Sequence, residues 1–189
     1  MKNIKTIVMA LVALVGSTTL NAQNKKIDIK KSNIEWVGKK VTGQHKGTIN
    51  FSEGALVFNG KLIKGGNFTV DMASIICTDL EAGNGKEKLE KHLKADDFFG
   101  VEKYPTAKLV FKTISSKGKG VYKINADLTI KEVTETISFD LIVKRKTATT
   151  SFKVNRTKFG IKYGSGSFFD NLGDKTINDD FDLTVNLQF

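Results

Sequence analysis

Hydrophobic and polar residues alternate with a period of two over most of the chain. Between residues 121 and 130 the even positions are apolar, and most of the positions between them are polar. The same alternation recurs in residues 136–143 and 181–189. A period of two is typical of a strand with one buried and one solvated face. Further strands are expected at 27–37, 41–51, 55–58, 66–73, 107–115 and 149–155.

About eight to ten such strands, separated by short turns that contain Gly, Asn or Lys, predict one all-β domain with an antiparallel sheet. Parallel pairing would need crossover helices, which the pattern does not contain. Alternation reports which face a residue occupies and says nothing of how a sheet closes. It therefore fits a closed barrel of about eight strands and a two-sheet sandwich equally well.

The alternation stops between residues 79 and 105. Here Asn84 is placed to cap a short helix, with Glu87 three residues further on. Leu89 and Leu93 form an apolar i, i+4 pair on an otherwise charged surface. So narrow an apolar stripe predicts one short helix lying across the edge or mouth of the sheet.

A second irregular segment, residues 164–176, is rich in Gly and Ser and carries Phe168 and Phe169. Gly and Ser clusters between periodic segments indicate loops. We expect a flexible loop whose paired aromatic side chains form part of a rim.

Phenylalanine is abundant, with 13 residues. Many of them occupy the apolar parity of their strands: Phe51, Phe58, Phe68, Phe111, Phe139, Phe152 and Phe181. Such side chains would line a cavity for a long apolar ligand in a barrel. The alternative is a solid Phe-rich core in a structural or adhesive β-sandwich that holds no ligand.

The N-terminus has the three-part pattern of a secretory signal peptide. Lys2 and Lys5 precede an unbroken apolar run over residues 7–15, and Ala22 ends a short segment with small residues. The run is too short for a bilayer span, which needs about 20 residues. We expect cleavage of residues 1–22, one remaining domain over residues 23–189, and export to a periplasm or the exterior.

The charge of the chain is strongly positive, with 30 Lys and Arg against 20 Asp and Glu and a formal net charge of +10. Lysines spread over turns and outward strand positions most simply keep a surface soluble. Nucleic acid is not an expected partner, because export argues against it and the basic cluster 144–146 lacks interleaved aromatic residues. Transient docking on anionic lipid headgroups is the alternative use of these lysines.

Catalytic and metal chemistry have few candidate residues. The single cysteine, Cys77, permits no intrachain disulfide and no multi-cysteine metal site, and there are only two histidines. No Gly-x-Ser-x-Gly motif is present, and the carboxylate pairs at 96–97 and 179–180 suit solvated turns better than glycosidase chemistry. We expect no catalytic residues, no metal and no cofactor.

Two polar residues, His45 and Arg156, fall on the apolar parity of their strands. An inward charge needs a partner, and a guanidinium suits a carboxylate or a phosphate. Both residues are therefore candidates for contact with a ligand headgroup. The alternative is a structural role, since buried charges are generally paired within the protein. In that interpretation Arg156 pairs with Asp71, Asp79 or Asp97, and His45 is a hydrogen-bonded core imidazole.

Short motifs along the whole chain resemble one known family, the YceI-like, polyisoprenoid-binding proteins. The similarity runs in order over residues 27–189. It rests on Ser32–Lys39, His45–Gly47, Gly66–Met72 with Ser74–Ile75, Leu89 with His92–Leu93, Asp97–Phe99, Tyr104–Ala107, Leu128–Ile130 with Thr134, Asn155–Thr157 and Phe159–Gly160.

The resemblance implies a lipocalin-like, extended antiparallel β-barrel, exported, with an elongated hydrophobic pocket and no established catalytic set. The implied ligand is an isoprenoid or another long-chain amphiphile, such as a polyprenyl phosphate, an isoprenoid quinone, or a fatty acid or amide. Transport or storage would be its role, in a monomer or homodimer. Together with strand parity, the resemblance indicates an apolar lining of Trp36, Phe51, Phe58, Phe68, Val70, Met72, Phe98, Phe99, Phe111, Leu128, Ile130, Phe139 and Phe152.

One segment departs from the family pattern. Lys131 and Glu132 follow the Leu-Thr-Ile stretch at a place where the family often has a glycine. We expect the turn there to differ in tightness or length.

Overall fold

The computed structural model describes residues 22–189, which form nine strands, one α-helix and two short 3-10 helices. The elements are β1 (Ala22–Lys26), β2 (Asn33–Lys40), β3 (Gly43–Asn59), β4 (Leu62–Cys77), α1 (Lys86–Lys94), β5 (Thr106–Gly118), β6 (Val121–Ile130), β7 (Val133–Lys144), β8 (Thr147–Asn155), η1 (Arg156–Phe159), η2 (Gly173–Lys175) and β9 (Asp180–Gln188). The predicted signal peptide lies outside the described residues except for Ala22.

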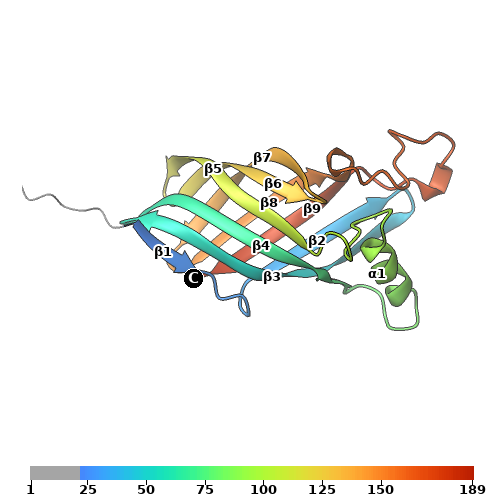
Figure 1. The fold of residues 1–189 in the computed structure, drawn as a ribbon, viewed down its shortest axis with the longest axis horizontal. Coiled ribbons are helices and arrows are strands. Elements are labelled where there is room, and N and C mark those ends of the chain that lie inside the picture. Colours follow the sequence, from blue (N-terminus) through green and yellow to red (C-terminus); the bar gives the residue numbers. More distant parts are fainter. Residues whose placement is uncertain (1–21) are drawn as a thin grey trace, which may run out of the picture.

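The strands form one antiparallel sheet in the order β1-β3-β2-β9-β8-β7-β6-β5-β4, and β3 also pairs with β4. That last pairing joins the two sides of the sheet, so strands β2 to β9 close into a barrel and β1 adds to β3 (Figure 1). The predicted eight-stranded antiparallel barrel is confirmed. The sandwich alternative is wrong, because a sandwich has two separate sheets, whereas here each of the strands β2 to β9 pairs with a neighbour on both sides within one sheet.

Strand β3 is long enough to serve three neighbours. Its first half pairs with β2, its second half pairs with β1, and β4 runs along it with register shifts after Thr48 and Phe51. Such bulges bend a strand and help a sheet to curl. The alternation predicted two separate strands here, 41–51 and 55–58, because the bulge breaks the period of two.

The predicted single strand over 27–37 is also wrong. The chain turns at Asp28, whose side chain accepts a hydrogen bond from the N–H of Lys30 at 3.1 Å and whose carbonyl accepts one from Ser32 at 2.9 Å. An Asp that bonds the backbone two residues on stabilises a turn. The turn separates β1 from β2.

Strand β6 shows how alternation builds the core. Its even residues, from Tyr122 to Ile130, are all buried, as predicted. The turn to β7 consists of Lys131 and Glu132, with φ of 50° and 64°. Two residues in the left-handed region make a tight hairpin turn that matches strand twist, and glycine adopts this conformation at lower cost. The turn therefore differs from the family pattern as expected, because two residues other than glycine adopt a conformation that glycine adopts with less strain.

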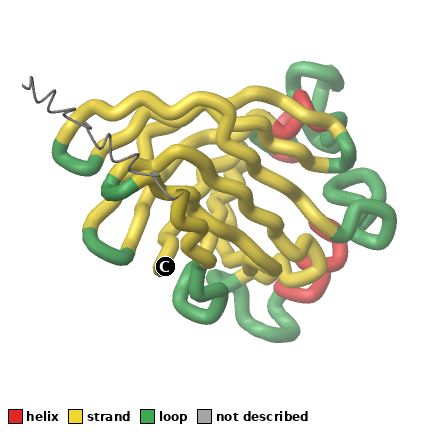
Figure 2. The backbone as a smooth tube through the Cα atoms, turned by 60° about the vertical axis from the view of Figure 1, so that its left-hand side comes forward, coloured by secondary structure: helices red, strands yellow, loops and turns green. Residues whose placement is uncertain are grey.

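Helix α1 lies across one end of the barrel, beside the end of β4 (Figures 1 and 2). Its N-cap is Gly85, with φ of 92°, so the predicted cap at Asn84 is wrong. The side chain of Glu87 instead accepts a hydrogen bond from the N–H of Gly83 at 3.1 Å. Leu93 is buried and Leu89 is partly buried, as their spacing predicted. In residues 22–189 no helix has the length and apolarity needed to cross a bilayer.

Candidate functional site

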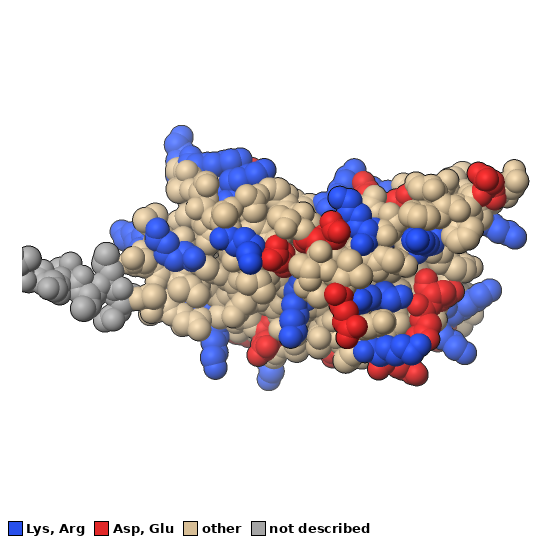
Figure 3. All heavy atoms as spheres, turned by 45° about the horizontal axis from the view of Figure 1, so that its top comes forward, with Lys and Arg blue, Asp and Glu red and all other residues tan. Residues whose placement is uncertain are grey.

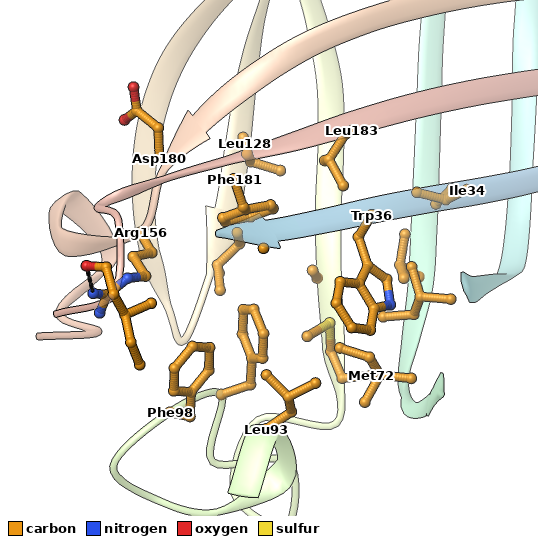
Figure 4. Close-up of a pocket in the computed structure, with 18 of the residues that line it drawn as sticks. Ile34, Trp36, Met72, Leu93, Phe98, Leu128, Arg156, Asp180, Phe181 and Leu183 are labelled. Carbon is orange, nitrogen blue, oxygen red and sulfur yellow. Dashed lines mark hydrogen bonds between the residues drawn. The ribbon is translucent and has the colours of Figure 1, made fainter. Parts of the chain in front are cut away.

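The interior of the barrel is incompletely filled. At the end covered by α1 it holds a cavity of about 130 Å³. Strands β2, β4, β5, β6 and β9 supply most of its wall, with side chains that include Trp36, Met72, Leu128 and Leu183 (Figure 4). Because these positions share the inward parity of their strands, the wall is apolar for the same reason that the barrel has a core.

The segment of α1 and the turn after it closes this cavity on one side. Leu93, Phe98 and Phe99 are each buried and reach the cavity wall. The rings of Phe98 and Phe99 meet edge to face, with centroids 5.2 Å apart. The ammonium of Lys131 donates to the carbonyls of Asp96 and Phe98, both at 2.9 Å, and so ties the turn to the β6–β7 hairpin.

A second compartment, of about 80 Å³, lies deeper in the barrel. Five aromatic rings form a continuous row around it, with centroid distances between 4.8 and 6.0 Å. The five are Phe51, Phe68, Phe111, Phe139 and Phe152. Ile34, Val70, Leu128 and Leu183 line both compartments, so the two spaces are neighbours along the barrel axis.

Polar side chains gather at one end of the main cavity. Arg156 and Asp180 lie on the opposite side from Ile34 in Figure 4, and Asn178 and Lys39 also contribute. Lys39 is paired with Asp182, at 2.6 Å between the ammonium and a carboxylate oxygen. The surface of the cavity is nevertheless almost wholly apolar, because Lys39 is paired with Asp182, Arg156 is bonded to backbone carbonyls, and the carboxylate of Asp180 points away from the space.

Arg156 starts η1 and is only 2% exposed. Its Nε, Nη1 and Nη2 donate to the carbonyls of Asn178, Ile161 and Ile177 at 2.9 to 3.0 Å. Burial lowers the pKa of Arg156, although the charge of Asp179, 3.6 Å from Nη2, opposes this. The guanidinium thus holds the β8–β9 loop against the barrel.

The predicted carboxylate partners of Arg156 are wrong. Asp71, Asp79 and Asp97 do not pair with it, and the charged partner is Asp179. Burial alone would raise the pKa of Asp179, but hydroxyl hydrogen bonds and the charge of Arg156 hold it below its ordinary value. The structural role expected for a buried arginine is present, and contact with a headgroup stays a prediction.

His45 lies outside the main cavity. It faces a groove between β2, β3 and α1, where Nδ1 is 3.1 Å from a carboxylate oxygen of Asp79 and the side chain is 33% exposed. His45 lies on the inner side of the sheet, as its parity predicted. At this position, however, β3 extends beyond the filled part of the barrel, so the side chain lies in the groove and not in the cavity. Its partner Asp79 also accepts the N–H of Lys46 at 2.9 Å.

The apolar residues predicted to line a pocket can now be placed. Trp36, Val70, Met72, Phe98, Phe99, Leu128 and Ile130 line the main cavity, and Phe51, Phe68, Phe111, Phe139 and Phe152 line the deeper one. Phe58 lines neither, because it packs against Phe189, with ring centroids 5.4 Å apart. The lining residues not predicted include Leu183, which strand parity indicated, and Ile177, which lies in a loop without periodicity.

The aromatic pair of the β8–β9 loop is exposed, with Phe168 at 48% and Phe169 at 50%. Lys162 lies over the ring of Phe168, 4.5 Å from its centroid. The loop lies at the same end of the barrel as α1 (Figure 1). This is the place expected for a rim.

Comparison with known proteins gives family and fold. Residues 26–189 match the model of the YceI-like domain. A UPF0312 protein of Pseudomonas putida strain W619 is 36% identical over 81 residues, which are 39% of this chain and 42% of that protein. A UPF0312 protein of Shewanella denitrificans is 32% identical over 92 residues, 49% of this chain and 46% of that protein. The aligned part of the chain thus spans less than half the length of these curated relatives.

Three solved structures share the architecture. Burkholderia cenocepacia BcnA superposes with a TM-score of 0.68 at 23% identity, covering 85% of this chain and 98% of that one. A polyisoprenoid-binding domain from Saccharophagus degradans, implicated in plant cell wall breakdown, gives 0.59 at 10% identity, covering 88% and 97%. The Campylobacter jejuni YceI protein gives 0.54 at 17% identity, covering 100% and 98%. At these identities the likeness shows the fold.

The geometry of Arg156 generates a prediction about stability. In Arg156→Lys a single ammonium replaces the fork that serves three carbonyls, so we expect the free energy of unfolding to fall by about 2 kcal/mol. Denaturant unfolding followed by circular dichroism measures this. The matched control is Arg145→Lys, since Arg145 is exposed and lies in a turn. Equal stability of both variants would contradict a bracing role for Arg156.

Proposed function

This chain belongs to the YceI-like domain family, and from that premise we propose that its barrel binds one long-chain amphiphile, an isoprenoid or a lipid of similar shape. The observation that carries the proposal is the cavity itself, whose surface is almost wholly apolar and which the charged Arg156 borders at one end. The related barrel that is described as polyisoprenoid-binding supports the choice of ligand class. The role we propose is binding for transport or storage, without catalysis.

The affinity for such a ligand would come from its chain. Each CH₂ moved from water to an apolar wall contributes about 0.8 kcal/mol. The main cavity and the deeper compartment share wall residues, so a chain that enters beside α1 would continue toward the aromatic row. Ordering of the chain and loss of its free motion offset part of this gain.

Polar groups of the ligand have two candidate partners, Arg156 and Trp36, which lie on opposite sides of the cavity (Figure 4). Three of the donor groups of Arg156 are already bonded to carbonyls, so its recognition of an anion would rest mainly on its charge. Trp36 also lines the main cavity, and among residues 22–189 its buried indole N–H has no acceptor. A buried donor without a partner is costly, and a ligand oxygen would satisfy it. Because Trp36 lies on the Ile34 side of the cavity, away from Arg156 (Figure 4), its N–H favours a carbonyl or hydroxyl oxygen on that side of the ligand, as in a quinone or fatty amide.

Contact with a membrane surface belongs to the same proposal, because a carrier must load from a lipid phase. On the face shown in Figure 3, Lys and Arg side chains are interspersed with Asp and Glu, which suits a solvated surface. The exposed Phe168 and Phe169 beside Lys162 are the better candidates for contact. Export, the oligomeric state and the natural ligand also stay predictions.

Blocking the passage between the two compartments tests the path of the chain. Val70 lines both spaces, so Val70→Trp would exclude long chains from the aromatic row while short chains still enter. We expect binding to weaken about fourfold for each CH₂ that is excluded. Displacement of an apolar fluorescent probe by isoprenoid alcohols of increasing length measures this.

The control for that series is Val110→Trp, because Val110 is 45% exposed on the outer face of β5. This variant should bind every chain length as the parent does. A Val70→Trp protein that remains folded and loses no affinity for long chains, or that loses affinity for all lengths equally, would refute a path through both compartments.

Vesicle association tests the membrane contact. Replacing Phe168 and Phe169 by Ser removes their apolar side chains from the loop, and we expect weaker sedimentation with vesicles that contain anionic lipid. Added salt should weaken the association of the parent further, because it screens lysine charges. Association that depends on neither the aromatic pair nor salt would remove this part of the proposal.

A further inference from the structure

Three side chains with metal-binding atoms lie close together beside the groove under α1. His45 comes from the start of β3, Cys77 ends β4, and Asp79 follows two residues later. One ligand atom of each lies within 4.8 Å of the others. Asp79 is central, since one carboxylate oxygen accepts the thiol of Cys77 at 3.1 Å and the other is 3.1 Å from Nδ1 of His45.

The backbone around this cluster is fixed on every side. Cys77 pairs with Gly47 in the β3–β4 ladder, and the N–H of Thr78 donates to the carbonyl of Lys46 at 2.9 Å. The N–H of Cys77 donates to a carboxylate oxygen of Glu90 in α1 at 2.8 Å. The three donor groups therefore hold their positions without a ligand, which reduces the ordering that binding requires.

The three ligand atoms are close enough together for small movements to place them around one ion. Zinc is bound at about 2.3 Å by thiolate sulfur and at about 2.0 to 2.2 Å by imidazole nitrogen or carboxylate oxygen, so its ligand atoms lie roughly 3.3 to 3.7 Å apart. In the cluster the thiol and the imidazole each lie 3.1 Å from a different oxygen of the Asp79 carboxylate, and one ligand atom from each residue lies within 4.8 Å of the other two. Small side-chain movements would open the centre to an ion.

The donor set also has a suitable chemistry. Sulfur, nitrogen and oxygen donors together suit Zn²⁺ and the divalent ions near it in the transition series. The Asp79 carboxyl is ionised: burial alone would raise its pKa, but hydrogen bonds from Lys46, Cys77 and His45 lower it to about 2. Burial raises the pKa of the Cys77 thiol, so this sulfur is protonated when no metal is bound.

We propose that His45, Cys77 and Asp79 form a binding site for a zinc-like divalent ion. The thiol of Cys77 releases its proton to water and binds as thiolate, the carboxylate of Asp79 binds without proton loss, and the ligating nitrogen of His45 carries no proton. The fourth position faces the groove that His45 lines together with Leu80 and Leu89, where water completes the tetrahedron. Sites with three protein ligands and an exchangeable fourth position are familiar for zinc.

The competing interpretation is a purely structural cluster. In it, Asp79 accepts hydrogen bonds from a thiol, an imidazole and a backbone N–H, and holds the ends of β3 and β4 together. This interpretation and the metal site make opposite predictions for one spectroscopic signal. A cobalt ion bound by a thiolate shows a sulfur-to-metal charge-transfer band, and an ion bound elsewhere does not.

The experiment is a titration of the purified, untagged protein with Co²⁺, followed by displacement with Zn²⁺. We expect the charge-transfer band and the visible bands of a tetrahedral ion at one equivalent, and their loss when Zn²⁺ is added. Cys77→Ser should abolish the charge-transfer band, and His45→Gln should weaken Zn²⁺ binding at least about tenfold, since even loss of an outer partner costs that much.

The matched control is His92→Gln, which removes the other histidine of the chain and leaves the cluster intact. It should keep the band and the affinity of the parent. Absence of the band in the parent protein, or Zn²⁺ binding that His45→Gln and His92→Gln weaken equally, would overturn the site. Because the first of these results needs no variant, the test does not depend on the folding of Cys77→Ser.

Discussion

Closure of the sheet through β3 is the constraint on which the rest of the structure depends. The strand pairs with β2 and β1 on one side and with β4 on the other, so no edge remains between the first and last parts of the barrel. Closed strands turn alternate side chains inward, and about eight of them enclose slightly more space than those side chains fill. The two compartments are that remaining space, and their apolar walls follow from the same parity that makes the core.

The end of the cavity that Arg156 borders is built by a different part of the chain. The β8–β9 loop would expose a run of backbone carbonyls inside the barrel mouth if nothing bonded them. Arg156 satisfies three of these carbonyls, and its charge is balanced by Asp179. One buried arginine therefore both fixes the loop and places a positive charge beside this end of the cavity, which couples the stability of the mouth to the proposed recognition of an amphiphile.

The fold and the apolar wall were largely predictable, because the side of the sheet on which a side chain lies is a local property of a strand. The alternation of β6 predicted every buried residue of that strand, and twelve of the thirteen predicted lining residues reach a compartment. Phe58 lines neither compartment. Parity predicts on which side of the sheet its ring lies, but not how far along the barrel axis the empty space extends. Strand ends were predicted less well, since the turn at Asp28 and the bulges of β3 arise from hydrogen bonds and curvature that leave no periodic signal.

The polar contacts were the least predictable part. Asp179 and Arg156 are 23 positions apart, and His45 and Asp79 are 34 apart, so only the closed sheet brings them together. For the same reason a chain with one cysteine and two histidines gave no sequence signal for a cluster of metal ligands.

Native mass spectrometry of the protein isolated from its producing cells tests the central claim most directly, followed by organic extraction and identification of what is released. We expect a chain of residues 23–189 that carries one equivalent of a long-chain isoprenoid or fatty amphiphile. A protein that carries no passenger, and that also fails to bind added quinone, polyprenyl phosphate or fatty acid, would contradict it.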